Sequence, residues 1–437
     1  MDPSPILLVH ESPESFRTTL APLGRFVYER SGRRSVVIGP VGDRPDMALI
    51  SAGGTTLATV DERPAPPSAA AGRSSILSIS RPSAVLAELR YWKREAARVL
   101  DLYQPAAIFT VKRDLQDSPF INRMARDRGI PVVGIQWSFL PPDDYERRRY
   151  RATYMWSVRD LPWPVRELRF LRARSEKWLH RLFYRVHGIN WRDSYIRMAD
   201  ASVQAVTNSL YAEVFSPASI PPDRVRVTGH PEDDVLLACK VRYLDPHERT
   251  RARREFGLTD GARVFILARE FMPATSGLID PEDDKKNLKS ALDLLSILPG
   301  TQTVLKLHPK DDPAEYNWVR QLFPGVMIVH RCDLYKLIAV SDCLLTQGSS
   351  VTRWAVVLGV PAALIDFAGL EFTAQAEKMF RVPRLQAVSE LKKFLDEVAA
   401  GRFRYDPEYI RPVVELVDGR ATERIVALSG IAQPSRT

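Results

Sequence analysis

Short apolar runs alternate with stretches of helical periodicity from about residue 263 onward. The runs predict strands, and the stretches between them repeat apolar side chains every three to four positions, as an amphipathic helix does. Strands are expected at Val264–Leu267, Thr303–Leu307, Val326–Val329, Cys343–Thr346 and Pro361–Ile365, and helices at Leu288–Leu298, Asn317–Phe323, Leu334–Val340 and Val351–Leu358. Repeated β-α order of this kind predicts a parallel, doubly wound sheet.

The first part of the chain repeats this rhythm less regularly. Strands are expected at Ile6–Val9, Val36–Ile38, Ala48–Ile50, Ala106–Val111 and Ile130–Ile135. Helices are expected at residues 14–31, interrupted near Pro22, at Ser83–Tyr103 with Ser83 as its cap, and at Phe120–Arg128. A stretch rich in Pro, Ala, Ser and Gly, Arg63–Ser75, predicts a surface loop.

The length of the chain, 437 residues, exceeds the ~250–300 residues at which a single hydrophobic core stops growing. With two β-α series, this predicts an α/β fold of two Rossmann-like, doubly wound domains facing a central cleft. We place the first domain at residues 1–140 and the second at 206–415, with a hinge strand and turn at Val225–Pro231. Residues 141–205 form a helical segment attached to the first domain, and 416–437 form a closing helix and tail.

Polar residues follow strands of the second series at the points where those strands end. One strand stops at His308, because the proline after it cannot donate to a ladder and disfavours helix before it. Another stops at Gly348, after which the pattern turns helical, so Ser349 and Ser350 fall at the expected N-cap and first turn. Amide groups and the positive end of the helix dipole bind phosphate there. Arg269 follows a third strand, at the same edge, where such sheets bind ligands.

Composition is that of an ordinary globular chain, with 45% hydrophobic residues. No uncharged apolar run approaches the ~20 residues that span a bilayer. The N-terminus, Met1–Pro5, lacks the basic region and apolar core of a secretory signal. The three cysteines are scattered without Cys-x-x-Cys spacing, which argues against a disulfide framework and a zinc site. We therefore expect a cytoplasmic protein.

The segment Tyr145–Asp200 is strongly basic and rich in tryptophan. It holds four of the eight tryptophans and fourteen Lys and Arg against six Asp and Glu, so its net charge of +8 accounts for nearly all of the formal +9. A basic, aromatic, helix-forming surface suits contact with anionic lipid headgroups. The alternative is a solvated basic face over ordinary helix packing. Nucleic acid is not expected, because no recognised fold or stacking motif accompanies the charge.

Four segments stand in order along the chain, at residues 227–234 (Val-Thr-Gly-His-Pro through Asp), 307–309 (Leu-His-Pro), 333–350 (Asp-Leu-Tyr through Ser-Asp to Ser-Ser) and 418–425 (Asp-Gly-Arg-Ala-Thr-Glu-Arg-Ile). They resemble the interdomain segment, the His-Pro motif, the strand leading to a Ser-Ser motif and the closing helix of GT-B glycosyltransferases of the bacterial surface-polysaccharide type. That broad group holds capsule transferases, bacterial sialyltransferases and CDP-glycerol glycerophosphotransferases. In GT-B enzymes the closing helix often packs back on the first domain.

The resemblance implies a donor phosphate site made of Arg269, His308, Gly348, Ser349, Ser350 and Thr352. Neutralising the leaving phosphate is the largest task of such an enzyme when no metal is used, and Arg269 could supply a bidentate charge. The acidic pairs Asp283-Asp284 and Asp311-Asp312 stand in polar turns and are expected to be solvated. The resemblance therefore implies metal-independent transfer from a CMP-, CDP- or UDP-linked sugar, with no other cofactor.

The base that activates the acceptor is expected from the first domain, which would bind the acceptor. Candidates at the carboxyl ends of its strands are Asp114, Asp117 and Glu11, although Asp117 precedes a helix start and could be an N-cap. The chain departs from its resemblance here. Glycerophosphotransferases have a His-Gly where this chain has Gln136-Trp137-Ser138, and the acidic-acidic-Gly triplet of the sialyltransferases is absent.

These observations imply an inverting glycosyltransferase that moves a sugar from a nucleotide-activated donor to a surface-glycan or lipid-linked acceptor. A base would activate an acceptor hydroxyl for direct displacement at the anomeric carbon. Such an enzyme would work in the cytoplasm, at the inner face of the membrane, in capsule or cell-envelope polysaccharide synthesis. The alternatives are a CDP-alditol phosphotransferase, a nucleotide-sugar 2-epimerase, whose acidic and arginine motifs are not found after Pro361, and a non-catalytic GT-B scaffold.

Overall fold

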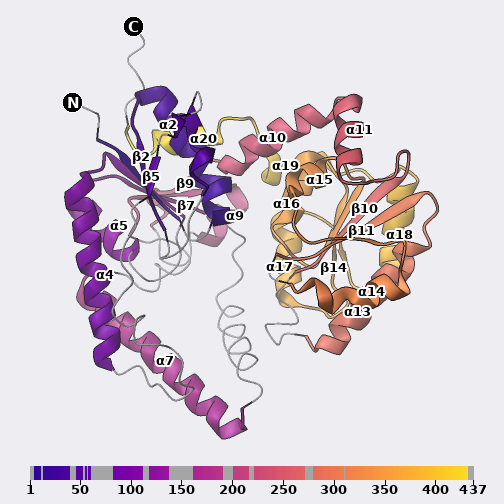
Figure 1. The fold of residues 1–437 in the computed structure, drawn as a ribbon, viewed down its shortest axis with the longest axis horizontal. Coiled ribbons are helices and arrows are strands. Elements are labelled where there is room, and N and C mark those ends of the chain that lie inside the picture. Colours follow the sequence, from indigo (N-terminus) through magenta and orange to yellow (C-terminus); the bar gives the residue numbers. More distant parts are fainter. Residues whose placement is uncertain are drawn as a thin grey trace. The chain divides into compact units, whose positions relative to one another are not determined.

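The computed structural model describes residues 4–10, 13–39, 46–52, 55–56, 58–60, 82–111, 118–136, 161–189, 200–215, 221–270, 279–309 and 311–431. It divides into two compact units (Figure 1). The first unit consists of Met1–Trp137, Leu171–Asp234 and Leu416–Thr437, and the second of Ser138–Phe170 and Val235–Glu415. Each unit is built on its own parallel sheet, so the fold class is the one that the sequence predicts.

The sheet of the first unit has seven described strands in the order β5-β2-β1-β6-β7-β8-β9, all parallel. They are β1 (Ile6–Val9), β2 (Ser35–Ile38), β5 (Ala58–Val60), β6 (Ala107–Thr110), β7 (Val132–Ile135), β8 (Val203–Val206) and β9 (Val225–Val227). The strand β1 is wholly buried and pairs on both sides, with Ile6 opposite Ser35 and Ala107. A separate antiparallel pair joins β3 (Ser51–Ala52) to β4 (Thr55–Thr56).

Helices cover both faces of this sheet (Figure 1). One face packs against α4 (Pro82–Tyr103), α5 (Ser118–Asp127) and the C-terminal part of α7 (Trp163–Val186). The other packs against the π-helix η1 (Phe16–Leu20), α2 (Ala21–Ser31) and α20 (Ala421–Ala427). The remaining elements of this unit are α1 (Pro13–Ser15), the 3-10 turns η2 (Met47–Leu49) and η3 (Pro222–Arg224), and α9 (Ser209–Phe215). Apolar side chains that alternate between two covered faces explain why the strands are apolar throughout.

The sheet of the second unit has six described strands in the order β12-β11-β10-β13-β14-β15, again all parallel. They are β10 (Arg263–Ala268), β11 (Thr301–Lys306), β12 (Met327–Val329), β13 (Cys343–Thr346), β14 (Ala362–Ile365) and β15 (Arg384–Leu385). The helical elements are α10 (Pro231–Tyr243), which begins in the first unit, α11 (Pro246–Glu255), α13 (Pro281–Ser296), η4 (Pro313–Tyr316), α14 (Asn317–Leu322), α15 (Leu334–Ala339), α16 (Val351–Leu358), α17 (Glu371–Phe380), α18 (Val388–Ala399) and α19 (Pro407–Val414).

The elements differ from the sequence prediction in a few places. Ala48–Ile50 was expected as a strand, but residues 47–49 form the turn η2, because the Asp46 side chain accepts a hydrogen bond from the Ala48 amide at 3.0 Å and caps a turn. The helix expected at Leu288 begins at Pro281, because Asp280 caps it. The helix α4 begins at Pro82, so Ser83 lies in its first turn rather than at the cap. The loop predicted at Arg63–Ser75 lies outside the described residues.

The boundary between the units also differs from the expected one. The sequence placed it at residue 206, but β8 and β9 extend the first sheet by parallel pairing, and the division falls after Asp234. The chain returns at Leu416, and α20 packs into the core of the first unit through Ile425 and Val426, as the resemblance implies for a closing helix. Among the described residues, none of the helices combines the length and the apolar character needed to cross a membrane.

Candidate functional site

Three neighbouring strands of the second unit end in polar residues at one edge of its sheet. The order β11-β10-β13 places the carboxyl ends of these strands side by side. Arg269 follows β10, His308 follows β11 and Gly348 follows β13. The structure therefore brings together the residues that the sequence selected, at the edge where parallel sheets bind ligands.

The serine pair stands where the sequence places it, at the start of α16. Ser350 is the N-cap residue, and its side chain makes no capping hydrogen bond. Ser349 and Ser350 are half-buried. A helix N-terminus attracts anions through its amide groups and its dipole, and a hydroxyl that is not used for capping can donate to such an anion. This end of α16 is thus suited to a phosphate group.

Gly348 occupies a position that excludes a side chain. Its φ is +134°, a backbone conformation that L residues rarely adopt. A β carbon at this position would come within 2.6 Å of the Phe372 ring. The glycine therefore lets the turn pass under Phe372 and delivers the chain to the serine pair.

Threonine hydroxyls hold the turn around Gly348 by hydrogen bonds. The buried Thr352 hydroxyl lies 2.8 Å from the Thr346 hydroxyl, and Thr346 Oγ1 also accepts a hydrogen bond of 3.3 Å from the Gly348 amide. Thr373 donates to the Gln347 carbonyl oxygen at 3.1 Å. Thr352 was predicted as a phosphate contact. In the structure its hydroxyl has a partner within the turn, and the phosphate contact stays a prediction.

Arg269 lies in a buried network that joins two of the strand ends. Its guanidinium forms an ion pair with Asp284 through Nη2 and Oδ2, and Nη1 donates to Gln347 Oε1 at 3.3 Å. Gln347 Nε2 in turn donates to Asp284 Oδ1 at 3.3 Å. Arg269 and Asp284 are 7% and 5% exposed, so the expectation of a solvated Asp284 was wrong. Burial alone would lower the pKa of Arg269, but the carboxylate of Asp284 outweighs burial and raises it.

The same network continues to the histidine. Arg269 Nε donates to the Tyr316 hydroxyl at 3.5 Å, and that hydroxyl donates to Asp311 Oδ2 at 3.2 Å. Asp311 Oδ2 also accepts a hydrogen bond of 2.9 Å from the His308 amide. Burial raises the pKa of Tyr316, so its phenol stays protonated and remains a donor. His308, Arg269 and Gln347 are therefore held in one framework, in which Arg269 positions its neighbours and is not a solvent-facing cation.

The three sequence candidates for the base, Glu11, Asp114 and Asp117, lie outside the described residues. Among the described residues at the carboxyl ends of the strands of the first sheet, His10 follows β1. It is fully buried, and its ring lies 5.7 Å from the Phe16 ring. Gln136, at the position of the missing His-Gly, accepts a hydrogen bond of 3.0 Å from the Thr207 amide through Oε1. Gln136 thus ties the end of β7 to the end of β8.

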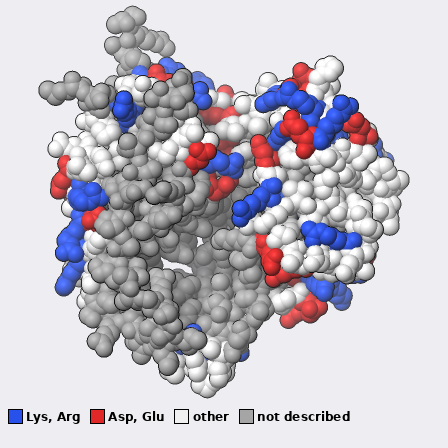
Figure 2. Space-filling model, in the orientation of Figure 1, with Lys and Arg blue, Asp and Glu red and all other residues white. Residues whose placement is uncertain are grey.

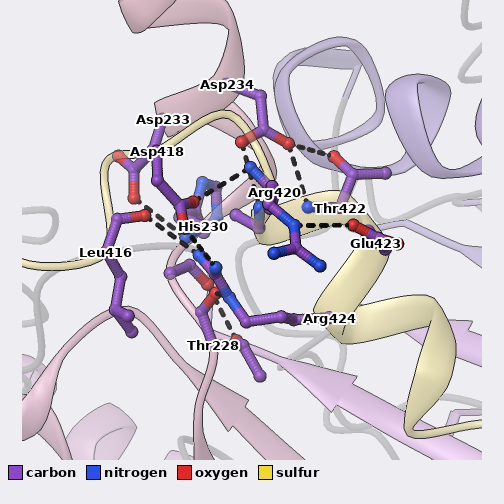
Figure 3. A network of polar contacts seen from close by, with 12 residues as sticks. Thr228, His230, Asp233, Asp234, Leu416, Asp418, Arg420, Thr422, Glu423 and Arg424 are labelled. Carbon is purple, nitrogen blue, oxygen red and sulfur yellow. Dashed lines mark hydrogen bonds and ion pairs between the residues drawn. The ribbon is translucent and has the colours of Figure 1, made fainter.

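A second polar network joins the interdomain segment to α20 within the first unit (Figure 3). Asp234 accepts hydrogen bonds from the Ala421 amide at 3.1 Å and from the Thr422 amide and hydroxyl at 2.9 and 2.7 Å. The carboxylate therefore caps the start of α20 from another part of the chain. The segment ending at Asp234 and the start of α20, nearly two hundred residues apart in the sequence, are therefore joined in one structural element.

Arg424 completes this network, which we call the junction network. Its guanidinium donates to the Thr228 carbonyl oxygen at 2.7 Å, to the Leu416 carbonyl oxygen at 3.0 Å and to Asp418 Oδ2 at 2.8 Å (Figure 3). A β carbon on Gly229, where φ is +77°, would approach the Ala421 side chain to 3.0 Å. The two places where the chain leaves and re-enters the first unit are thus bound to each other.

A cavity of about 380 Å³ lies in the second unit at the opposite edge of its sheet. It is lined where strands begin, by Arg263, Asp342 and Pro361 among others. The basic lining residues Lys240 and Arg249 donate to carbonyl oxygens near the ends of α16 and α15, at 3.2 and 3.0 Å. These contacts satisfy helix carboxyl termini, and the cavity lies where the strands begin, away from the strand ends at Arg269, His308 and Gly348. No group of three or more His, Cys, Asp or Glu within the described ranges could hold a metal ion.

No protein-family model matches the sequence, and a comparison with curated proteins also finds no match. Solved structures match over nearly the whole chain. UDP-GlcNAc 2-epimerase from Neisseria meningitidis, bound to UDP-GlcNAc, is 15% identical, covers 97% of this chain and 98% of its own, and has a TM-score of 0.59. The glycotransferase of kitacinnamycin is 14% identical, with 98% of each chain covered and a TM-score of 0.56. The wall teichoic acid polymerase TagF is 14% identical, with 98% and 88% covered and a TM-score of 0.52.

The two parallel α/β units and these neighbours define the chain as a protein of the GT-B fold. At such identities the likeness defines the fold, and the reaction has to be argued from the site.

Proposed function

We propose that the chain is a glycosyltransferase that moves a sugar from a nucleotide-activated donor to a surface-glycan or lipid-linked acceptor, with inversion and without a metal ion. The observation that supports this most is the buried framework that holds His308 and the turn before Ser349 at one edge of the second sheet. Such a framework fixes the groups that would meet a diphosphate before the donor arrives, and preorganised groups stabilise developing charge best.

In this proposal the donor phosphates lie at the N-terminus of α16. The hydroxyls of Ser349 and Ser350 and the dipole of α16 would bind the phosphate oxygens, and His308 would add a further donor. These groups would neutralise the charge that develops on the leaving nucleotide as the bond to the sugar breaks. Arg269 would act indirectly. It orients Gln347 and, through Tyr316 and Asp311, the turn that carries His308.

The first unit would bind the acceptor and provide the catalytic base. Asp114, Asp117 and Glu11 remain the candidates for that base, which would take the proton from the acceptor hydroxyl as it attacks the anomeric carbon. We further propose that the protein works in the cytoplasm at the inner face of the membrane, in the synthesis of capsule or other cell-envelope polysaccharide. The basic segment 145–200 would be the part that contacts anionic lipid.

A nucleotide-sugar 2-epimerase is the second candidate. It is favoured by the match to the epimerase from Neisseria meningitidis, which covers nearly the whole length of each of the two chains. An epimerase would change the donor alone, whereas a transferase would need an acceptor, so NMR of the donor with enzyme separates them. The TagF neighbour likewise keeps a CDP-alditol phosphotransferase open, and a scaffold would bind nucleotide without turnover.

A thermal-shift screen against UDP, CDP, CMP, GDP and ADP, with and without magnesium, tests the donor site, since a ligand of the folded state raises the melting temperature. We expect a shift with one pyrimidine nucleotide. His308→Ala and Ser349→Ala should each weaken its binding about 10- to 100-fold in calorimetry, because a hydrogen bond to a charged group is worth about 1.5–3 kcal/mol.

Ser290→Ala is the matched control, because Ser290 is, like Ser349, a half-buried serine, and its hydroxyl donates within α13, to the Lys286 carbonyl oxygen at 3.0 Å. It should leave the affinity unchanged. Unchanged affinity in His308→Ala and Ser349→Ala would defeat the phosphate assignment, and the absence of any nucleotide shift would favour the scaffold.

A further inference from the structure

The helix α7 carries a row of large apolar side chains that face solvent. In a helix of 3.6 residues per turn, positions three, four and seven apart share a face. In the part of α7 that belongs to the first unit, the exposed members follow that spacing, with fractional exposures of 55% for Leu171, 58% for Trp178, 44% for Leu182 and 72% for Val186. We call these four residues the α7 stripe. Exposed Ser175 lies within it.

The opposite side of α7 is already used for packing. Tyr184 is fully buried, and Leu179 and Phe183 pack against the same core cluster. The Tyr184 ring lies 5.2 Å from the Phe120 ring of α5, and the Phe183 ring lies 6.1 Å from it. The stripe is therefore a second apolar face, on a helix whose first apolar face already joins the core. Single exposed apolar residues are ordinary, but an aligned row of four is a candidate interaction surface.

Positive charge accompanies the stripe. Arg174 and Arg185 are exposed. Helical geometry places both beside the stripe, next to Trp178 around the helix axis. Around α11, by contrast, arginines are paired with acidic neighbours, as in the bonds of 2.8 Å to Glu248 from Arg251 of α11 and from Arg242 of α10. Figure 2 shows blue and red side chains interspersed over α11. Along α7 itself, seven Lys and Arg stand against two Glu, so the charge of this helix fits an anionic partner.

We propose that the α7 stripe docks on the surface of an anionic lipid bilayer. An amphipathic helix that lies on a membrane buries its apolar face at the headgroup boundary, with tryptophan at the interface and arginines reaching the anionic headgroups. Trp178 lies within the stripe, with Leu171 about two turns before it and Leu182 about one turn after it. Charge complementarity favours an anionic bilayer over a second copy of the chain as the partner, because two such basic faces would repel each other.

The inference deepens the function proposed above, since it names the surface by which that enzyme would reach a lipid-linked acceptor. Its test does not depend on catalysis. The full chain is sedimented with vesicles of phosphatidylcholine alone and of phosphatidylcholine with phosphatidylglycerol, over a range of salt concentrations. We expect binding to the anionic vesicles only, and a fall in binding as salt rises.

Two variants and a control locate the surface. Trp178→Ser with Leu182→Ser should weaken vesicle binding at least tenfold, and Arg174→Gln with Arg185→Gln should reduce its dependence on salt. Leu244→Ser with Ile297→Ser removes two apolar side chains that are 73% and 74% exposed elsewhere, and should bind as the unchanged protein does. Melting temperatures and the nucleotide shift should be the same in all of them.

Vesicle binding by the Trp178 and Leu182 variant at full strength would overturn the proposal. So would a stripe-dependent dimer in light scattering without vesicle binding, since the occupant would then be a second copy. Failure of the nucleotide screen with stripe-dependent vesicle binding intact would count against the enzymatic function and leave the docking surface supported.

Discussion

Gly348 is the residue at which the turn before the serine pair is most constrained. Gly348→Ala places a methyl group against the Phe372 ring and a side chain at a φ of +134°. We expect a cost of about 1–3 kcal/mol, seen as a lower melting temperature together with weaker nucleotide binding. Gly300→Ala is the control, since Gly300 also has positive φ, +66°, but no neighbour near its β carbon. In the background of Phe372→Ala the cost should fall, and an unchanged cost would mean that the contact is unimportant.

The Arg269–Asp284 pair gives a second test at this scale. Asp284→Asn leaves a buried guanidinium without its carboxylate, which we expect to lower the free energy of unfolding by about 3–5 kcal/mol. Arg269→Met with Asp284→Leu removes both charges, and should cost much less than the two single changes added together. Denaturant unfolding of the unchanged protein, Arg269→Met, Asp284→Leu and the double variant measures this difference. Simple additivity would show that the pair is not coupled.

Single residues also show where sequence reasoning about the site stops. The positions of Arg269, His308 and Ser349 follow from the rule that parallel strands present their carboxyl ends together. That Asp284 is buried and Asp283 is exposed could not be read from two adjacent acids in a polar turn. The difference depends on Arg269 and Gln347, which come from other strands and leave no local pattern.

At the scale of elements, α20 depends on a cap supplied by Asp234. Asp234→Ala should lower the free energy of unfolding by about 1–2 kcal/mol, because two amides and a hydroxyl lose their acceptor. Asp245→Ala removes an ordinary cap from α11, where Asp245 accepts from the His247 amide at 2.8 Å. Both should destabilise the chain, but only Asp234→Ala should speed amide hydrogen exchange in α20. Equal exchange in the two variants would argue against the junction network.

The junction network also predicts a dependence on pH. The hydrogen bond from Arg424 lowers the pKa of Asp418 below its ordinary value. A carboxyl group with a lower pKa in the folded state stabilises that state above its unfolded pKa of about 3.9, and the benefit is lost as pH falls through the folded value. Asp418→Asn should therefore melt at a lower temperature than the unchanged protein at pH 7, and the difference should shrink as the pH falls below about 3.9. The pair is partly exposed, so the difference should be small and should shrink with salt.

Most strands could be predicted because they are apolar runs of four or more residues, such as Ile6–Val9 and Cys343–Thr346. The run Ala48–Ile50 is shorter, and there the Asp46 side chain decides the local structure. Periodicity along the chain says which element forms, but it does not say which sheet the element joins. The strand β9 reads equally well as the last strand of one unit or the first of the next.

At the scale of the whole molecule, the first unit is discontinuous, and this leads to our last prediction. Its core includes Ile425 and Val426, which the chain delivers only after the second unit is complete. A fragment of residues 1–234 would leave their sites empty and lose about 1.5–3 kcal/mol for each side chain, besides the caps at Asp234. It should therefore be unstable, whereas residues 235–415 contain the whole second sheet and its core cluster and should fold alone.

The junction network shows how the last segment of the first unit, Leu416–Thr437, can be joined directly to residue 234. Asp234 contacts Ala421 directly, and Arg424 binds both the Thr228 and Leu416 carbonyl oxygens, so a short flexible linker can join residue 234 to residue 416. This linked fragment should show a cooperative thermal transition that the 1–234 fragment lacks. Addition of Ile425→Ala and Val426→Ala to the linked fragment should abolish the gain, because the helix then returns without the side chains that fill the core. A 1–234 fragment as stable as the linked one would mean that α20 closes the unit without supporting it.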